Sequence, residues 1–122
     1  MSYGIEKPLF WVASSRKDLI SMPAEVQDTF GYALYLAQTG GKHSDAKPLK
    51  GFGHTGVLEI VEDHRGNTYR AIYALRFGNA VYVLHCFQKK SIRSIQTPLH
   101  DIAMIKTRLM AAESHWKGLL HD

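Results

Sequence analysis

Seven side chains in the sequence form a candidate set for binding phosphate and moving protons. Lysine and arginine supply positive charge, and histidine and tyrosine can serve as acids or bases. The set comprises Lys50, His54, Arg70, Tyr73, His85, Lys89 and Lys90. RNA cleavage without a metal ion needs such a set: a base for the ribose 2′-hydroxyl, an acid for the leaving 5′-oxygen, and cations for the charged phosphorane. By composition alone, this chemistry is one of several that the set would serve.

The stretch of residues 80–93 joins an apolar, β-branched and aromatic run to a cationic end that contains Lys89, Lys90 and Arg93. The run predicts a strand in the middle of a sheet. A buried strand is rigid, so it would hold its terminal cations in the fixed positions that phosphate recognition requires. The simpler interpretation is that the lysines only end a hydrophobic strand and keep it soluble.

Arg70 lies between apolar residues in a second predicted strand, residues 68–77. The two-residue period places Arg70, Ile72, Ala74 and Arg76 on one face of that strand, with Tyr69, Ala71, Tyr73, Leu75 and Phe77 on the other. Arginine is seldom buried without a partner, and Glu59 on the preceding strand is the obvious one. A structural Glu59–Arg70 pair and a phosphate-binding role for Arg70 are both open.

Other chemistries find little support in the spacing of the residues. The seven histidines form no His-x-His or helical i, i+4 pair, so no metal site is predicted. No glycine-rich phosphate loop or nucleophile elbow is present, and we expect no cofactor. Cys86 is the single cysteine, which excludes an internal disulfide, and its apolar surroundings indicate a buried hydrophobe.

The totals indicate one globular domain spanning residues 1–122. The chain has 122 residues, 45% of them hydrophobic, with 15 Lys and Arg against 11 Asp and Glu. A net charge of +4 is compatible with a polyanionic partner. No signal-peptide pattern or membrane-spanning stretch is apparent, so we expect a cytoplasmic protein.

Hydrophobic periodicity and turn signals predict the elements that must position these side chains. A strand at residues 7–13 is followed by a short helical turn at residues 16–20 and a longer helix after Pro23, with a buried stripe of Val26, Phe30, Ala33, Leu34 and Ala37. A polar loop spans residues 41–55. Strands at residues 56–62 and 68–77 and a third strand that starts at residue 80 form an antiparallel meander. Thr97 would cap a last helix whose core stripe is Leu99, Ile102, Ala103, Leu109 and Met110. The class is α+β, an antiparallel sheet with N-terminal helices packed on it and a C-terminal helix.

Five motifs in this order resemble a known family: PLKG at residues 48–51, GVLEI at 56–60, YRAIY at 69–73, VLHCFQKK at 83–90, and Thr97-Pro98 before the helix that contains Asp101-Ile102. Over about residues 8–113 the chain resembles the phage-related, HigB-like branch of the RelE/ParE toxin superfamily. Each motif is weak alone, but their order and spacing together are specific.

The resemblance implies the toxin of a type II toxin–antitoxin pair with the small RelE-like fold. Such toxins cleave mRNA, typically on the ribosome, without a metal or cofactor, and their partner is a small antitoxin that often has a helix-turn-helix domain. The family's basic positions correspond to Lys50, Arg70, Lys89 and Lys90, and its acidic strand position to Glu59.

Several assignments within this site stay open. His54 and Arg93 are further candidates for RNA contact. Many relatives have an arginine soon after the acidic position, whereas Ile60 and Val61 follow Glu59 here, so Arg65 or Arg76 would have to supply that cation. The general base is Lys89, Lys90, His85 or Tyr73, and a lysine base would need a pKa lowered by its cationic neighbours.

Two other functions suit the same scaffold, because a fold does not decide function. One is a ParE-like toxin that inhibits DNA gyrase. The other is a catalytically degenerate family member that only binds its antitoxin. The concentration of lysine and arginine at strand ends favours RNA.

Overall fold

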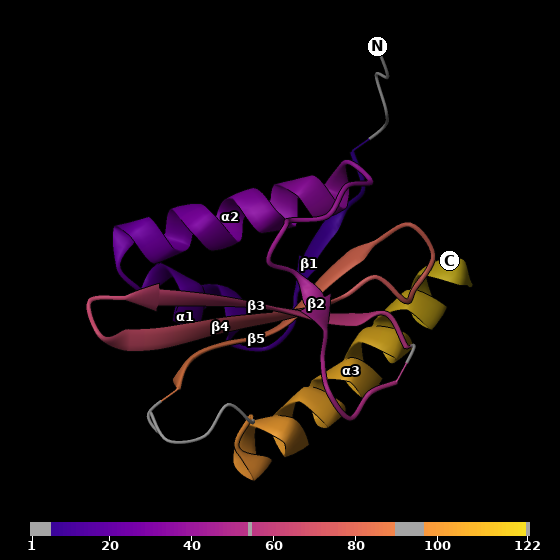
Figure 1. Cartoon of the computed structure of the whole chain (residues 1–122). Coiled ribbons are helices and arrows are strands. Elements are labelled where there is room, and N and C mark those ends of the chain that lie inside the picture. Colours follow the sequence, from indigo (N-terminus) through magenta and orange to yellow (C-terminus); the bar gives the residue numbers. More distant parts are fainter. Residues whose placement is uncertain (1–5, 54, 90–96, 122) are drawn as a thin grey trace.

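The computed structural model describes residues 6–53, 55–89 and 97–121. Its elements, in chain order, are β1 (Leu9–Trp11), α1 (Ser15–Ile20), α2 (Ala24–Gln38), β2 (Lys47–Pro48), β3 (Val57–His64), β4 (Asn67–Ala74), β5 (Val81–Lys89) and α3 (Leu99–Leu120) (Figure 1). The expected order of a strand, helices, three strands and a helix is therefore present. The short strand β2 lies inside the segment that the sequence predicts as an irregular loop.

The five strands form one mixed sheet in the order β1-β5-β4-β3-β2. The meander β3-β4-β5 is antiparallel, as predicted. β1, however, pairs parallel with β5, so the sheet is not antiparallel throughout. The sequence pattern marks β1 as a strand but contains no turn that joins it to its distant partner, and so it does not specify the direction of pairing.

Helices cover both faces of the sheet: α1 and α2 lie on one side and α3 on the other (Figure 1). The predicted apolar stripe of α2 is fully buried against the first face, which we call the α2 face. On the opposite face, called the α3 face, Ile105 and Ala112 pack against Ile72, Tyr82 and other sheet residues. The buried cores on the two faces hold the sheet rigid from both sides. Among the described residues, no helix is both long and apolar enough to cross a bilayer.

The predicted core stripe of the last helix is wrong in part. Leu99, Ala103 and Met110 are exposed, whereas Ile105 and Ala112 are buried. The helix also begins one residue later than expected, with Pro98 rather than Thr97 at the cap position. The sequence offers apolar residues on more than one side of this helix, and packing against β5 selects the side.

A β-bulge in β5 decides which side chains share the α3 face. Ile72 pairs with His85, but the next residue, Tyr73, pairs with Val83, so Leu84 is an extra residue in the ladder. One extra residue reverses the alternation of the strand beyond it. His85 therefore points to the same face as Ile72 instead of to the α2 face.

Candidate functional site

Arg70 and Glu59 form the ion pair that their neighbouring strands predict. Glu59 pairs with Ile72 in the ladder, so Arg70 lies diagonally from it on the α3 face. Arg70 Nη1 is 2.9 Å from Glu59 Oε2 and also donates to Thr97 Oγ1 at 3.3 Å. Both side chains are buried. A carboxylate this close keeps the arginine in a fixed orientation, which serves either a structural or a phosphate-binding role.

Lys89 ends β5 beside this pair and is also buried, at 6% exposure. It pairs with Thr68, two positions before Arg70 on β4. Burial lowers the pKa of the Lys89 amine, and the positive charge of Arg70 lowers it further, while Glu59 opposes the shift. A lysine with a lowered pKa is more easily found in the neutral form that accepts a proton.

A cavity of about 430 Å³ opens next to Arg70, and we call it the cationic pocket. Its charged lining residues are Lys47, Lys50, Glu59, Arg70 and Lys106. Lys50 and Arg70, two of the candidates from the sequence, thus line the same pocket. Lys106 of α3 and Lys47 of β2 were not expected in this pocket. Lys47 lies three residues before Lys50 in the sequence, and its Nζ is 3.8 Å from Glu59 Oε1. Four cations against one carboxylate make this pocket suitable for an anion.

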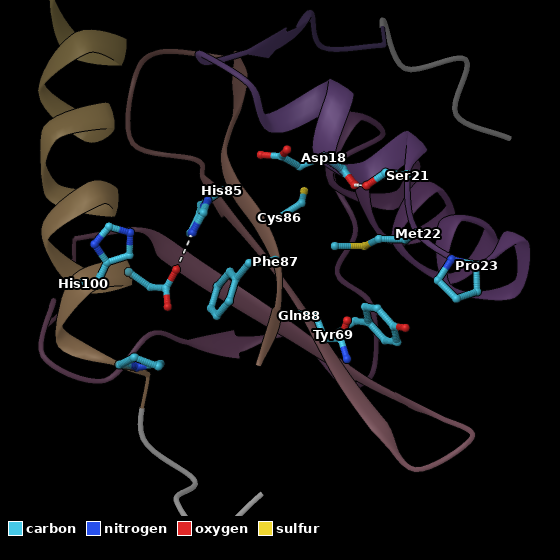
Figure 2. Close-up of a pocket in the computed structure, with 12 residues that line it drawn as sticks. Asp18, Ser21, Met22, Pro23, Tyr69, His85, Cys86, Phe87, Gln88 and His100 are labelled. Atoms are coloured by element: carbon cyan, nitrogen blue, oxygen red, sulfur yellow. Dashed lines mark hydrogen bonds and ion pairs between the residues drawn. The ribbon is translucent and has the colours of Figure 1, made fainter. Parts of the chain in front are cut away.

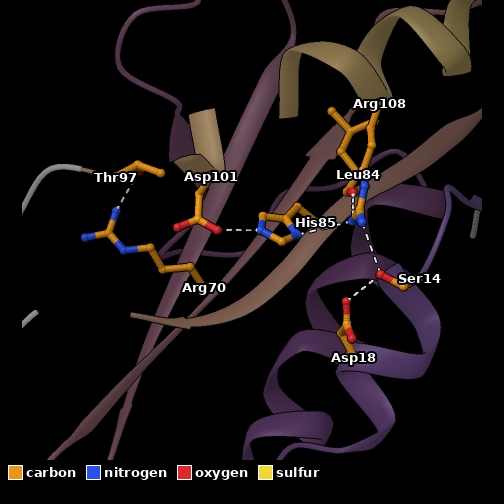
Figure 3. Close-up of polar contacts among 8 residues, drawn as sticks. All are labelled: Ser14, Asp18, Arg70, Leu84, His85, Thr97, Asp101 and Arg108. Carbon is orange, nitrogen blue, oxygen red and sulfur yellow. Dashed lines mark hydrogen bonds and ion pairs between the residues drawn. The ribbon is translucent and has the colours of Figure 1, made fainter. Parts of the chain in front are cut away.

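His85 is held between two charged residues of α3 (Figure 3). Its Nε2 lies 2.7 Å from Asp101 Oδ1, and its Nδ1 lies 3.2 Å from Arg108 Nη1. A guanidinium only donates hydrogen bonds, so Nδ1 accepts and the proton resides on Nε2. Burial lowers the pKa of His85, opposed by the hydrogen bond to Asp101. With both nitrogens engaged, the ring is suited to position its neighbours rather than to accept a proton.

Arg108 extends this network to the start of α1. It donates to Leu84 O at 3.0 Å and to Ser14 Oγ at 3.1 Å, and Ser14 donates to Asp18 Oδ2 at 2.8 Å (Figure 3). Sequence reasoning missed Asp101 and Arg108 as site residues. Their seven-residue spacing puts both on one side of a helix, and this was the available signal.

A second cavity, of about 820 Å³, lies along β5 between the N-terminal part of α3 and the α1–α2 junction, and we call it the β5 pocket (Figure 2). Its lining includes Phe87 and Tyr69, and its carboxylates are Asp18 and Asp101. The His85 and Phe87 rings stack at 4.6 Å between centroids. No lysine or arginine is among the described residues that line it, so its charge is opposite to that of the cationic pocket.

Tyr73 is separated from these groups, which corrects its expected place in the site. It lies on the α2 face within the hydrophobic core and is only 1% exposed. Burial raises its pKa to about 12, and its buried hydroxyl has no hydrogen-bond partner among the described residues. The alternation of β4 already puts Tyr73 and Arg70 on opposite faces, so this separation follows from the sequence.

The remaining candidates lie elsewhere or outside the described residues. Arg65 is exposed in the β3–β4 turn, and Arg76 is exposed beyond the end of β4, with its guanidinium carbon 5.9 Å from the centre of the Phe77 ring. Neither lines the cationic pocket. His54, Lys90 and Arg93 fall outside the part of the chain that the structure describes. Within that part, no three His, Cys, Asp or Glu side chains gather in a way that would hold a metal ion.

Comparisons with known proteins give one family match. The model of the family described as phage-derived protein Gp49-like matches residues 17–110. A solved structure, the RelBE2 toxin–antitoxin complex from Mycobacterium tuberculosis, is similar with a TM-score of 0.45 and 18% identity, over 71% of this chain and 95% of that chain. No curated protein matches.

Proposed function

Because the chain belongs to the phage-derived Gp49-like family, we propose that it is the toxin of a type II toxin–antitoxin pair that cleaves mRNA without a metal ion. The sequence motifs described above link it to HigB-like toxins of the RelE/ParE superfamily. The proposed partners are a cognate antitoxin protein and mRNA on the ribosome, in the cytoplasm.

The observation that carries this proposal is a pair of buried cations on one face of the sheet: Arg70, which lines the cationic pocket, and Lys89, whose pKa the charge of Arg70 lowers. In the proposed reaction, Arg70 and the lysines of the pocket hold the scissile phosphate and stabilise its developing charge. Lys89, in its neutral form, removes the proton from the ribose 2′-hydroxyl. The 2′-oxygen then attacks the adjacent phosphorus as the bond to the 5′-oxygen breaks, which leaves a 2′,3′-cyclic phosphate, and solvent water protonates the departing 5′-oxygen.

The roles of the other candidates follow from their surroundings. Both ring nitrogens of His85 are engaged in hydrogen bonds, so we do not assign it the role of the base. Instead, His85 holds the side chains of Phe87 and Asp101 in position. Lys50 contacts the RNA backbone in this scheme. Lys90 and Arg93 remain expected contributors because they follow Lys89 in the sequence.

Primer extension on cellular mRNA after a brief induced pulse of the protein tests the proposal. We expect new 5′ ends within translated codons for the native chain. Arg70→Gln and Lys89→Met should each reduce the cleavage rate about 100-fold or more, because one removes phosphate binding and the other the base. Arg76→Gln, a matched change of an exposed arginine outside the pocket, should cleave normally.

Circular dichroism on the purified variants separates loss of activity from loss of fold. Normal cleavage by a folded Lys89→Met variant would remove Lys89 as the base. Intact messages alongside arrested growth would contradict the endoribonuclease and direct attention to DNA gyrase. Absence of any toxicity would indicate a degenerate, antitoxin-binding family member.

A further inference from the structure

The β5 pocket is the larger of the two cavities, and the proposed phosphate-binding and proton-transfer steps leave it without a role. Two pairs of neighbouring residues show that it adjoins the cationic pocket. Arg70, which lines the cationic pocket, pairs in the sheet with Phe87, which lines the β5 pocket. At the start of α3, Thr97 borders the first and Pro98 the second. A ligand with its phosphate at Arg70 therefore has the β5 pocket within reach of its neighbouring groups.

The charges of the two pockets select different parts of an RNA chain. The cationic pocket attracts phosphate. The β5 pocket contains the carboxylates of Asp18 and Asp101, which repel phosphate and accept hydrogen bonds from N–H donors. A nucleobase is the uncharged part of a nucleotide that carries such donors, so a base is the part that suits the β5 pocket.

The aromatic lining provides a stacking surface for a base. Phe87 is only partly buried and Tyr69 stands on the other side of β5 (Figure 2). His85 stacks on Phe87 and is itself fixed by Asp101 and Arg108, so it restricts the orientation of the phenyl ring. Proteins commonly recognise unstacked RNA bases by this combination of an aromatic ring and polar groups that contact the Watson–Crick edge.

Carboxylates favour one base over the others. The Watson–Crick edge of guanine presents two neighbouring donors, N1–H and the exocyclic amino group, which match the two oxygens of a carboxylate. Adenine and cytosine place a ring acceptor beside their amino group, and uracil flanks its single N–H with two carbonyl oxygens. Asp101 accepts from His85 through Oδ1, and a carboxylate has further acceptor positions for a base.

We propose that the β5 pocket binds a guanine base of the RNA whose neighbouring phosphate is held at Arg70. The inference rests on the proposed endoribonuclease function and adds a sequence preference to it. Asp101 and Asp18 supply the acceptors, Phe87 supplies the stacking surface, and His85 and Arg108 act as positioning residues.

Binding of nucleoside monophosphates to the purified full-length chain tests the pocket without requiring cleavage. By calorimetry we expect guanosine 5′-monophosphate to bind about 10-fold or more tightly than the uridine, cytidine and adenosine monophosphates, in line with the discrimination that one bidentate contact provides. Equal affinity for guanosine and uridine monophosphates would overturn the proposal. Binding of arginine amide in place of any nucleotide would also overturn it, because it would indicate a pocket for a cationic side chain of a partner protein.

Asp101→Asn gives a sharper test at the level of a single atom. The asparagine carbonyl can still accept from His85, but its amino group replaces an acceptor by a donor. We expect the preference for guanosine monophosphate to fall about 10-fold and the RNA cleavage sites to lose their guanine bias. Asp28→Asn, on the exposed side of α2, is the matched control and should change neither. Phe87→Leu should lower the affinity for all four nucleoside monophosphates by a similar factor, about 5-fold or more, because stacking is tolerant of base identity.

The outcomes separate the pocket from the nuclease. Guanosine monophosphate binding that depends on Asp101, in a protein that cleaves no RNA, would support the pocket and contradict the endoribonuclease. RNA cleavage with no guanine bias, unchanged in a folded Asp101→Asn variant, would overturn the pocket and leave the endoribonuclease standing.

Discussion

Burial has different consequences for the two cations on the α3 face. An arginine cannot lose its proton in a protein, so buried Arg70 requires the carboxylate of Glu59 close by. A lysine can become neutral, and burial together with Arg70 lowers the pKa of Lys89. The same environment therefore favours a permanent charge at one position and a proton acceptor at the other, two functions that phosphodiester cleavage requires.

His85 makes a pH-dependent contribution to stability that can be measured without any activity. Burial lowers its pKa below the ordinary value of 6.5, so the unfolded chain binds a proton at this residue more readily than the folded chain. Its contribution is fully present above pH 6.5 and is lost as the pH falls toward the lower, folded-state pKa. We expect the free energy of unfolding by urea to decrease over this range, by up to about 1.4 kcal/mol per pH unit from this one group.

His85→Gln should make that pH dependence shallower, because glutamine does not titrate but can still donate to Asp101. His121→Gln, at the exposed end of α3, is the control and should leave the slope unchanged. Equal slopes for the native chain and the His85→Gln variant would show that His85 is not the group responsible.

Arg108 connects three elements that are distant in the sequence. One guanidinium contacts the bulge of β5, the side chain of His85 and the residue that precedes α1. We expect Arg108→Met to lower the free energy of unfolding by about 2–4 kcal/mol, because it leaves buried acceptors without donors. Urea denaturation measures this effect, and Arg16→Met on the exposed side of α1 is the matched control. A loss for Arg108→Met no larger than that of the control would mean that water replaces these hydrogen bonds.

The helices and strands themselves were largely predictable from the sequence, but the details of how they pair and pack against one another were not. The stripe of α2 and the meander follow from periodicity and turn residues, which act over short distances. The bulge that puts His85 on the same face as Arg70 has no such local signal, because it is defined only by pairing with β4. The buried side of α3 depends on packing against β5, so Asp101 and Arg108 were overlooked while Leu99 was wrongly placed in the core. Long-range contacts decide each of these cases.

At the scale of the whole molecule, charge is divided between two adjoining pockets. The net charge of +4 says only that the whole chain carries more positive than negative charge. In the structure, cations gather around Arg70 in the cationic pocket, and carboxylates line the β5 pocket together with Phe87. This division could not be predicted from composition, since Lys50 precedes β3 whereas Lys106 lies on α3, far from it in the sequence. It follows from the packing of α3 over the strands that carry Arg70.

Under the proposed function, the division of charge predicts how RNA binding would depend on salt. Each phosphate that a lysine neutralises contributes about −0.7 to the slope of log affinity against log salt for a single strand. Lys50→Gln and Lys106→Gln should each make the slope shallower by about 0.7, measured by fluorescence anisotropy with a short single-stranded RNA. Lys17→Gln, an exposed lysine of α1 outside the cationic pocket, should not. If all three variants keep the native slope, the RNA backbone does not bind in the cationic pocket.

The position of β5 in the sheet also sets a limit on when the protein can fold during its synthesis. Of the strands that the structure describes, β5 is made last, yet it lies between β1, which is made first, and β4. β1 pairs with no other described strand, so the early part of the nascent chain must wait until residues 81–83 have left the ribosome. Lys89 comes later still, and α3, which supplies Asp101 and Arg108, follows it in the chain. The site is thus assembled only after residues 99–108 have left the ribosome, well after the strand that carries Arg70.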